Sequence, residues 1–167
     1  MKTNKNVKGF TLVELIVVIA IIGVLAAILV PSMLGYVKKS KISSANTEAK
    51  NAYDAVNTTM IELDSEGIGS NQVDGDHDIK GTAAWSIGTV DVLSRIHNYF
   101  DASKLAQAWA QVTGGTCTAV VVADGKYTGG YPAPAPAEKS ATEKNGGAHS
   151  GSGYWTLDEA SSAASHS

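Results

Sequence analysis

A single uninterrupted apolar block near the N-terminus constrains this chain more than any other feature. Phe10 to Val30 reads FTLVELIVVIAIIGVLAAILV, twenty-one residues that carry one charge, on Glu14. A helix of about 20 residues is roughly 30 Å long, which matches the hydrocarbon core of a bilayer. The block therefore predicts a helix that spans a membrane or is buried in an equally apolar assembly.

Lysines lie on both sides of this block. Lys2, Lys5 and Lys8 precede it, and by the positive-inside rule they predict a cytoplasmic N-terminus with the rest of the chain outside. The run 38–41, which holds three further lysines, follows the block. These lysines weaken the charge asymmetry without reversing it.

Glu14 distinguishes the kinds of N-terminal segment that this block could form. A secretory signal has a shorter apolar core and a small-residue cleavage site; residues 25–27, Leu-Ala-Ala, imitate such a site, but a carboxylate inside the core is unfavourable for it. A plain membrane anchor gives Glu14 no role, although a central acidic residue costs about 2.5 to 3.5 kcal/mol on insertion scales. Because an acid in such a segment usually marks function, we expect Glu14 to have a specific partner.

Residues 8–14, KGFTLVE, resemble the type IV prepilin signature: a short basic leader that ends in Gly9, then Phe10, then Glu14 four residues later. The similarity extends over about residues 8–36, and it covers both type IV pilins and the pseudopilins of secretion and DNA-uptake machines. The signature is specific because the cleavage junction, the acid and the apolar span must all coincide.

The resemblance implies a path of processing and assembly. A dedicated prepilin peptidase would cut between Gly9 and Phe10 and would then N-methylate Phe10. The new ammonium group of Phe10 would meet Glu14 of a neighbouring copy in a helical filament. Because burial of either charge alone is expensive and pairing recovers much of the cost, we expect this pair to set register more than to add stability.

The resemblance also implies partners and a location. The partners would be further copies of the chain, the peptidase, a membrane platform protein and a cytoplasmic ATPase. The precursor would span the inner (cytoplasmic) membrane, and the mature chain would become part of an extracellular pilus on the cell surface. The resemblance further implies that the helix between Gly23 and Pro31 loosens on assembly, although Gly is common in membrane helices and Pro bends any helix.

Two other functions stay open at this point. The signature does not separate a pilus from the pseudopilus of a type II secretion or competence system, although the chain length and a Gly/Pro/Ala-rich outer segment favour the pilus. The hypothesis from a different class is a simple membrane-anchored extracellular binding module, whose apolar helix never leaves the bilayer.

Helical spacing continues beyond Pro31 to about Leu63. Apolar side chains recur there at intervals of three or four residues: Ile42, Ala45, Ala49, Tyr53, Val56, Met60 and Leu63. A helix from Phe10 to Leu63 would be about 80 Å long, and a small domain can cover only its second half. The first half must then be buried in lipid or in a filament core.

We therefore expect an α+β fold in which a long N-terminal helix packs on a small antiparallel sheet, as in type IV pilins. The expected parts are a leader over 1–9, a transmembrane and assembly half-helix over 10–30, an exposed half-helix over 31–64, and a globular head over 65–167 that includes a C-terminal loop.

Within the head, turn-forming residues at 66–71 end the long helix, and a looped stretch runs to about Gly88. The segments 90–100 and 101–112 both show helical spacing. Asp101 or Ser103 would cap the second of these helices.

β-Branched residues predict a strand over 116–123, and Asp124-Gly125 is a hairpin signal that leads into a second strand over 126–131. A third strand is predicted at 154–157. The Pro/Ala-rich and polar segment 132–153 indicates an extended loop, and the small polar residues 160–167 indicate a disordered tail.

The sequence predicts no enzyme, no cofactor and no metal site. The four histidines are scattered, no nucleophile motif is present, and the pairs Gly129-Gly130 and Gly146-Gly147 are typical of turns rather than of a phosphate-binding loop. Three tryptophans at 85, 109 and 155 are expected in the core or against the sheet.

Asp74, Asp76 and Asp78 alternate as at the start of a calcium loop. The EF-hand pattern then requires Gly where Ile79 stands and Glu where Trp85 stands, so this segment is not an EF-hand. A solvated acidic loop is the favoured interpretation, with a calcium site as the alternative.

Charge argues against one further class of protein, and cysteine content excludes another. Without residues 1–9 the chain has ten basic and sixteen acidic side chains, a formal charge of −6, which argues against non-specific nucleic-acid binding. The one cysteine, Cys117, excludes an internal disulfide and a cysteine-based metal cluster. We expect it to be a buried thiol on a strand.

Overall fold

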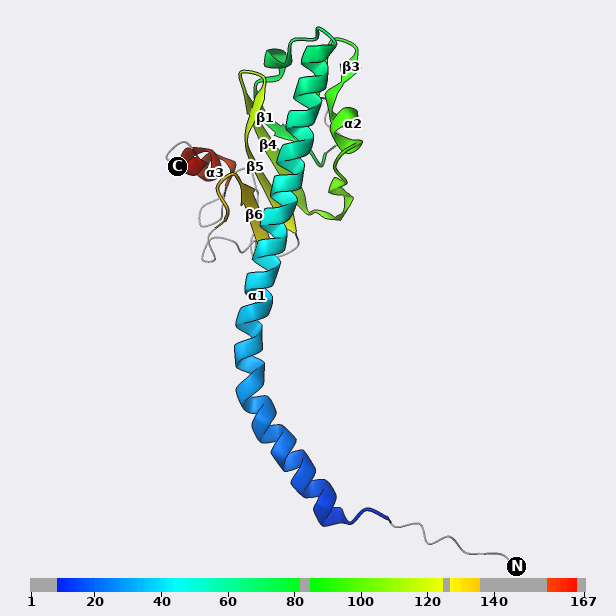
Figure 1. Ribbon diagram of the computed structural model, residues 1–167, viewed down its shortest axis with the longest axis vertical. Coiled ribbons are helices and arrows are strands. Elements are labelled where there is room, and N and C mark those ends of the chain that lie inside the picture. The colour runs from blue at the N-terminus through cyan, green and yellow to red at the C-terminus, as the bar shows by residue number, and fades with distance from the viewer. Residues whose placement is uncertain (1–8, 82–84, 125–126, 136–155, 165–167) are drawn as a thin grey trace, which may run out of the picture. The chain divides into compact units, whose positions relative to one another are not determined.

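The computed structural model describes residues 9–81, 85–124, 127–135 and 156–164, and its ribbon is drawn in Figure 1. The chain divides into two units, Met1–Lys38 and Lys39–Ser167. In chain order the elements are α1 (Leu12–Ser65), η1 (Ser70–Val73), β1 (Gly75–Asp78), β2 (Ser86–Ile87), β3 (Val90–Asp91), α2 (Val92–His97), η2 (Ala102–Lys104), β4 (Gln107–Thr113), β5 (Thr116–Asp124), β6 (Tyr127–Tyr131) and α3 (Leu157–Ala164).

The long helix is confirmed, since α1 runs unbroken for 54 residues and contains Pro31. Of the seven apolar positions predicted to face the head, only Tyr53 is half-buried; the other six are buried. The buried face also includes Ala52, Ala55 and Thr59. Small side chains on this face let the helix approach the sheet closely.

The end of α1 follows the turn residues that predict it. The Gly67 N–H bonds to the Asp64 carbonyl at 3.0 Å, and the Ile68 N–H bonds to the Leu63 carbonyl at 2.9 Å. This is the Schellman arrangement, which needs a left-handed residue just past the helix, and Gly67 has φ +77°. Ile68 then packs on the same core as Leu63, as the motif requires.

The head is a four-stranded antiparallel sheet in the order β1-β4-β5-β6, and a two-stranded ribbon, β2-β3, lies apart from it. Val120 and Val122 of β5 belong to the core that includes α1. Ala119 and Val121, which alternate with them, pack instead with Leu157 of α3. β5 is therefore covered on both faces, by α1 and by α3 (Figure 1). The predicted fold class, a long helix on a small antiparallel sheet, is confirmed.

β6 contains the pair Gly129-Gly130, so the prediction of a turn there is wrong. The physical reason is the closeness of α1. A Cβ atom added to Gly129 would lie 2.1 Å from the backbone carbon of Ala45. Only a residue without a side chain lets this strand pass so near the helix backbone.

The prediction of helices over 90–100 and 101–112 is only partly confirmed. The first becomes β3 followed by the short helix α2, whose N-cap is Asp91. The second is wrong, because residues 107–113 form β4, where Ala108, Ala110 and Val112 alternate inward. The segment fits both the two-residue and the three-to-four-residue period, and its pairing with β1 and β5 makes it a strand. Asp101 does act as a cap, but for the single turn η2.

The strands predicted at 116–123 and 126–131 are confirmed as β5 and β6, and they pair antiparallel from Asp124 and Tyr127. The looped stretch before Gly88 is wrong in part, since it contains η1, β1 and β2. β1 pairs with β4, and this pairing gives the segment its extended form.

The C-terminal predictions also need correction. Leu157 begins α3 rather than ending a strand, with Thr156 just before the helix, and residues 160–164 are helical rather than disordered. Thr156 and Glu159 form a capping box, in which each side chain accepts from the backbone N–H of the other, at 3.3 Å and 3.2 Å. Buried Leu157 and Ala160 hold the helix against the sheet. Residues 136–155, with Gly146-Gly147, His149 and Trp155, lie outside the described residues, as does His166.

Candidate processing and assembly segment

The predicted processing residues lie just before α1. Gly9 and Phe10 precede the first helical residue, and both are exposed. The side chain of Phe10 is 86% exposed. Thr11 stands at the N-cap position, since its carbonyl accepts the first helical hydrogen bond, from the Leu15 N–H at 3.3 Å. The peptide bond between Gly9 and Phe10 is thus outside the hydrogen-bonded helix.

Glu14 reaches back to the start of the helix. Its Oε2 atom accepts from the Thr11 N–H at 2.9 Å and from the Thr11 hydroxyl at 2.6 Å. The Glu14 N–H donates in turn to the Thr11 Oγ1 at 3.3 Å. This is a capping box, with Thr11 at the N-cap and Glu14 at the third helical position. A negative charge in the first turn also complements the positive end of the helix dipole.

The sequence interpretation missed Thr11, although the signal was present. The spacing Thr-x-x-Glu before an apolar run is the capping-box pattern, and it occurs at Thr11–Glu14 as it does at Thr156–Glu159. The structure therefore adds one residue to the predicted set and gives Glu14 a bonding partner inside its own chain.

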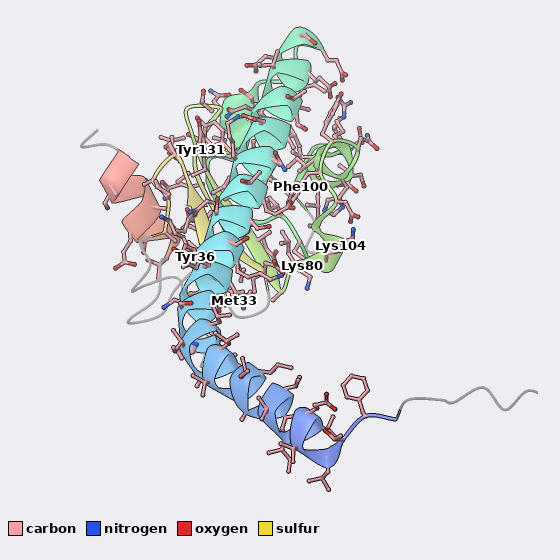
Figure 2. All side chains as sticks on the ribbon, turned by 60° about the horizontal axis from the view of Figure 1, so that its bottom comes forward. Met33, Tyr36, Lys80, Phe100, Lys104 and Tyr131 are labelled. Carbon is pink, nitrogen blue, oxygen red and sulfur yellow. The ribbon has the colours of Figure 1, made fainter. Side chains whose placement is uncertain are left out.

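The apolar N-terminal part of α1 is not buried by any other part of the described chain. Its most apolar stretch of 18 residues has a mean hydropathy of 3.1 and is 0% buried, and by length and composition α1 is long enough to cross a membrane. Between Phe10 and Val37, nineteen large apolar side chains are exposed, the least of them, Val18, at 47%. Figure 2 shows this bare surface, with Met33 and Tyr36 labelled. Exposure on this scale is what an assembly or membrane surface presents.

Two asparagines of α1 bond to the sheet. The Oδ1 atom of Asn46 accepts from the backbone N–H of Gly130 at 3.0 Å and of Ala135 at 3.1 Å. Eleven residues later, which is three helical turns, the Oδ1 atom of Asn57 accepts from the Cys117 N–H at 3.0 Å. These contacts hold the second half of α1 against β6 and the start of β5. No pattern in the sequence predicts these asparagine hydrogen bonds.

The acidic segment 74–78 is structural. Asp74 accepts from the N–H groups of Gly115 and Gly114 at 3.0 and 2.9 Å, and these bonds lower the pKa of its carboxyl group. Asp76 accepts from Gln111 of β4 at 3.1 Å. Asp78 accepts from the backbone N–H of Lys80 at 2.9 Å. In the described part of the chain no three His, Cys, Asp or Glu side chains come together as metal ligands.

The two described histidines are bound to backbone carbonyls. The Nε2 atom of His77 lies 2.7 Å from the Val73 carbonyl, and the ring stacks on Trp85 at 4.0 Å. Burial lowers the pKa of His77, against the opposing effects of the Val73 carbonyl and the Asp76 charge. His97 contacts the Ile79 carbonyl at 2.8 Å. Both rings therefore have structural roles.

Cys117 and the described tryptophans lie where the sequence predicts. Cys117 is 1% exposed on β5, and burial raises the pKa of its thiol to about 12. Such a thiol is unreactive at neutral pH. Trp85 is buried in the main core, and Trp109 packs against the cluster beneath α3.

Comparison with known proteins points to the same N-terminal segment. The pattern named the prokaryotic N-terminal methylation motif matches residues 4–30. The chain is similar to the type IV major fimbrial protein FimA of Dichelobacter nodosus, with 40% identity over 75 residues, 41% of this chain and 48% of the relative.

Two further relatives give similar values. The chain is 40% identical over 70 residues to the type IV major pilin protein PilA of Myxococcus xanthus, covering 42% of this chain and 32% of the relative. It is 45% identical over 71 residues to the type IV wide pilus major component PilA4 of Thermus thermophilus, covering 41% and 50%.

These matches span about a third to a half of the length of the curated relatives. No solved structure matches the chain.

Proposed function

We propose that this chain, which is similar to type IV pilins in part of its length, is a structural subunit of a type IV pilus filament. It polymerises through the apolar half of α1 after a prepilin peptidase has removed residues 1–9. It acts as a building block and not as an enzyme.

The observation that supports this proposal most is the contrast between the two halves of α1. Buried positions recur along the helix from Ile42 to Leu63, whereas Phe10 to Val37 is exposed on every side. Each large apolar side chain is worth about 1.5 to 3 kcal/mol when fully buried. A segment with nineteen of them is stable only in lipid or against other copies of itself.

Glu14 gives that segment its register in the proposal. Before assembly its carboxylate is satisfied by Thr11 of the same chain. Cleavage after Gly9 creates an ammonium group at Phe10, which stands beside Thr11 and is N-methylated. In the filament Glu14 pairs with the Phe10 ammonium of a neighbouring copy, because neither charge can enter an apolar core alone.

The precursor lies in the cytoplasmic membrane with its lysine-rich leader in the cytoplasm, in agreement with the positive-inside rule. Residues 10–30 form the transmembrane and assembly half-helix, 31–64 the exposed half-helix and 65–167 the head. The platform protein and the ATPase of a pilus machine lift the subunit out of the membrane. The printed names of the relatives refer to pili and fimbriae, which favours a pilus over a pseudopilus.

Glu14→Ala tests the proposal against the simple membrane anchor. A pilus subunit with this change inserts in the membrane and is cleaved but forms no filaments that can be sheared from cells. Thr11→Ser is the matched control, because it keeps the hydroxyl acceptor and donor of the capping box. Unchanged filament yield in Glu14→Ala contradicts the assigned role of Glu14, and a wild-type chain found only in membranes contradicts the pilus.

A further inference from the structure

A groove of about 570 Å³ lies in the head between α1 and the segment that carries Phe100 and Lys104. Figure 2 labels both residues, on the side of α1 away from Tyr131. Ala55, Phe100 and Leu105, each 4 to 5% exposed, are buried along its lining. A packed lining of this kind gives the groove a fixed shape.

Carboxylates dominate the rim of the groove. Glu48, Asp54, Asp101 and Asp124 line it together with a single ammonium group, that of Lys104. Asp54 has an exposed partner, Lys50, at 3.4 Å, and Asp101 caps η2. Among the described residues, Glu48 and Asp124 have no ion-pair partner. The groove therefore offers negative charge, part of it unengaged, to a basic partner.

The complementary charge lies on the same helix, before the groove. Lys39 and Lys41 are exposed, and within the described residues neither has an ion-pair partner. Lys41 precedes Asp54 by 13 residues, or about 20 Å along α1, so it cannot reach the middle of the groove of its own chain. The run 38–41 nevertheless holds three of the ten basic residues that remain after cleavage at Gly9.

We propose that the groove receives Lys39 and Lys41 of a second copy of this chain. The inference rests on the proposed filament. The shift that brings the Phe10 ammonium of one copy to Glu14 of another moves the first copy toward the C-terminal end of its neighbour's α1. That shift of four residues, about 6 Å along the helix, brings Lys41 of the first copy to the level of residue 45 of its neighbour, one turn before Glu48, the first α1 residue that lines the groove.

Charge balance supports a second copy as the occupant. The processed chain has a formal charge of −6, so heads brought close together repel one another unless acids face bases. Lysines set against the groove replace part of this repulsion with attraction. Complementary charge of this kind fixes register and rejects wrong alignments more than it adds affinity.

Charge exchange in the full-length chain tests the proposal. Glu48→Lys with Asp124→Lys, and separately Lys39→Glu with Lys41→Glu, should each lower the yield of sheared filaments about tenfold, because like charges then face each other. The four changes combined should restore the yield to near wild type. Asp158→Lys, an exposed acid on α3, is the control for charge alone.

A cross-link identifies the occupant. Lys41→Cys with Glu48→Cys places two thiols about 10 Å apart in one helix, too far for a disulfide within a chain. Cys117 is buried and should not take part. The pair should give a ladder of chain multimers on a non-reducing gel, while each single change gives dimers at most.

The outcomes separate this inference from the proposed function. Wild-type filaments together with normal yields from both charge-reversed variants overturn the groove contact alone. Reversed variants that stay low when combined, or a cross-link to a different protein, overturn it as well. Loss of filaments in the Asp158→Lys control shows a general charge effect and also contradicts the proposal. A wild-type chain that forms no filament overturns both proposals.

Discussion

The side-chain oxygen of Asn57, on α1, accepts a hydrogen bond of 3.0 Å from the backbone N–H of Cys117, at the start of β5. The two residues are sixty positions apart, so this bond joins the helix to the sheet directly. Cys117 is 1% exposed and Asn57 is half-buried, so water has little access to the Cys117 N–H.

Asn57→Ala is therefore expected to lower the free energy of unfolding of the head by about 1 to 3 kcal/mol, the cost of leaving a buried N–H without an acceptor. Asn51→Ala, an exposed change on the same helix, is the control. Thermal unfolding of the full chain in detergent micelles measures the difference. Equal stability of the two variants would show that the Asn57 bond contributes nothing.

Gly129→Ala should be more harmful than its size suggests. The new methyl group would lie 2.1 Å from the Ala45 carbonyl carbon and 2.2 Å from its oxygen, so the strand and the helix must move apart. Overpacking of this kind costs about 1 to 3 kcal/mol, which thermal unfolding can detect.

A second change distinguishes backbone contact from side-chain crowding at Gly129. Because the obstructing atoms are backbone atoms, Ala45→Gly is not expected to rescue Gly129→Ala. Full rescue would mean that the Ala45 methyl group, and not the helix backbone, limits the approach.

His77 should make the stability of the head depend on pH. Burial lowers its pKa in the folded chain, so the unfolded chain takes up a proton first as the pH falls. The contribution of neutral His77 is present above the unfolded pKa of about 6.5 and is lost as the pH falls through the lower folded value.

His77→Phe tests this dependence, since a phenyl ring can keep the stack on Trp85 but cannot titrate. Melting temperatures between about pH 7.5 and about pH 5.5 should fall less in the variant than in wild type. An identical fall in both proteins would assign the pH dependence to other groups.

Thr11→Val examines the capping box. Valine has the shape of threonine but lacks the hydroxyl group that bonds Glu14 in both directions. Loss of such a cap costs about 0.5 to 2 kcal/mol, and the first turn of α1 should fray. Amide exchange at Glu14 in micelles should accelerate in the variant, and an unchanged rate would contradict the cap.

The fold was predictable where the sequence pattern indicated a single kind of secondary structure. The apolar block and the three-to-four spacing that follows it predict α1, and the β-branched run from Thr116 predicts β5. The helix end at Gly67 followed in the same way from local turn residues. Each of these signals depends on neighbours in sequence, which a single chain displays directly.

Predictions failed where contacts distant in sequence decide the structure. Residues 107–113 fit both periods weakly, and pairing with β1 and β5 selects the strand. Gly129-Gly130 has the composition of a turn, but it pairs with β5 as part of a strand. Glycine at 129 leaves room for the backbone of α1, which lies against this strand. Nothing in the neighbouring sequence distinguishes Asn46 and Asn57 from other polar helix residues, because their hydrogen-bond donors are backbone N–H groups of the sheet.

The candidate site was predictable for a different reason. Gly9, Phe10 and Glu14 belong to a motif whose meaning is chemical and local, so no tertiary contact was needed to find them. Thr11 belongs to the same run, yet its role depends on helix-cap geometry, which the structure displays.

Mass spectrometry of the N-terminal peptide, taken separately from sheared surface filaments and from membranes, tests the central claim most directly. The account predicts that the chain in sheared filaments begins at Phe10 and bears one N-methyl group. The same start confined to the membrane fraction would contradict a surface pilus and favour a pseudopilus. An intact Met1, or a start near Ile28, would contradict prepilin processing altogether.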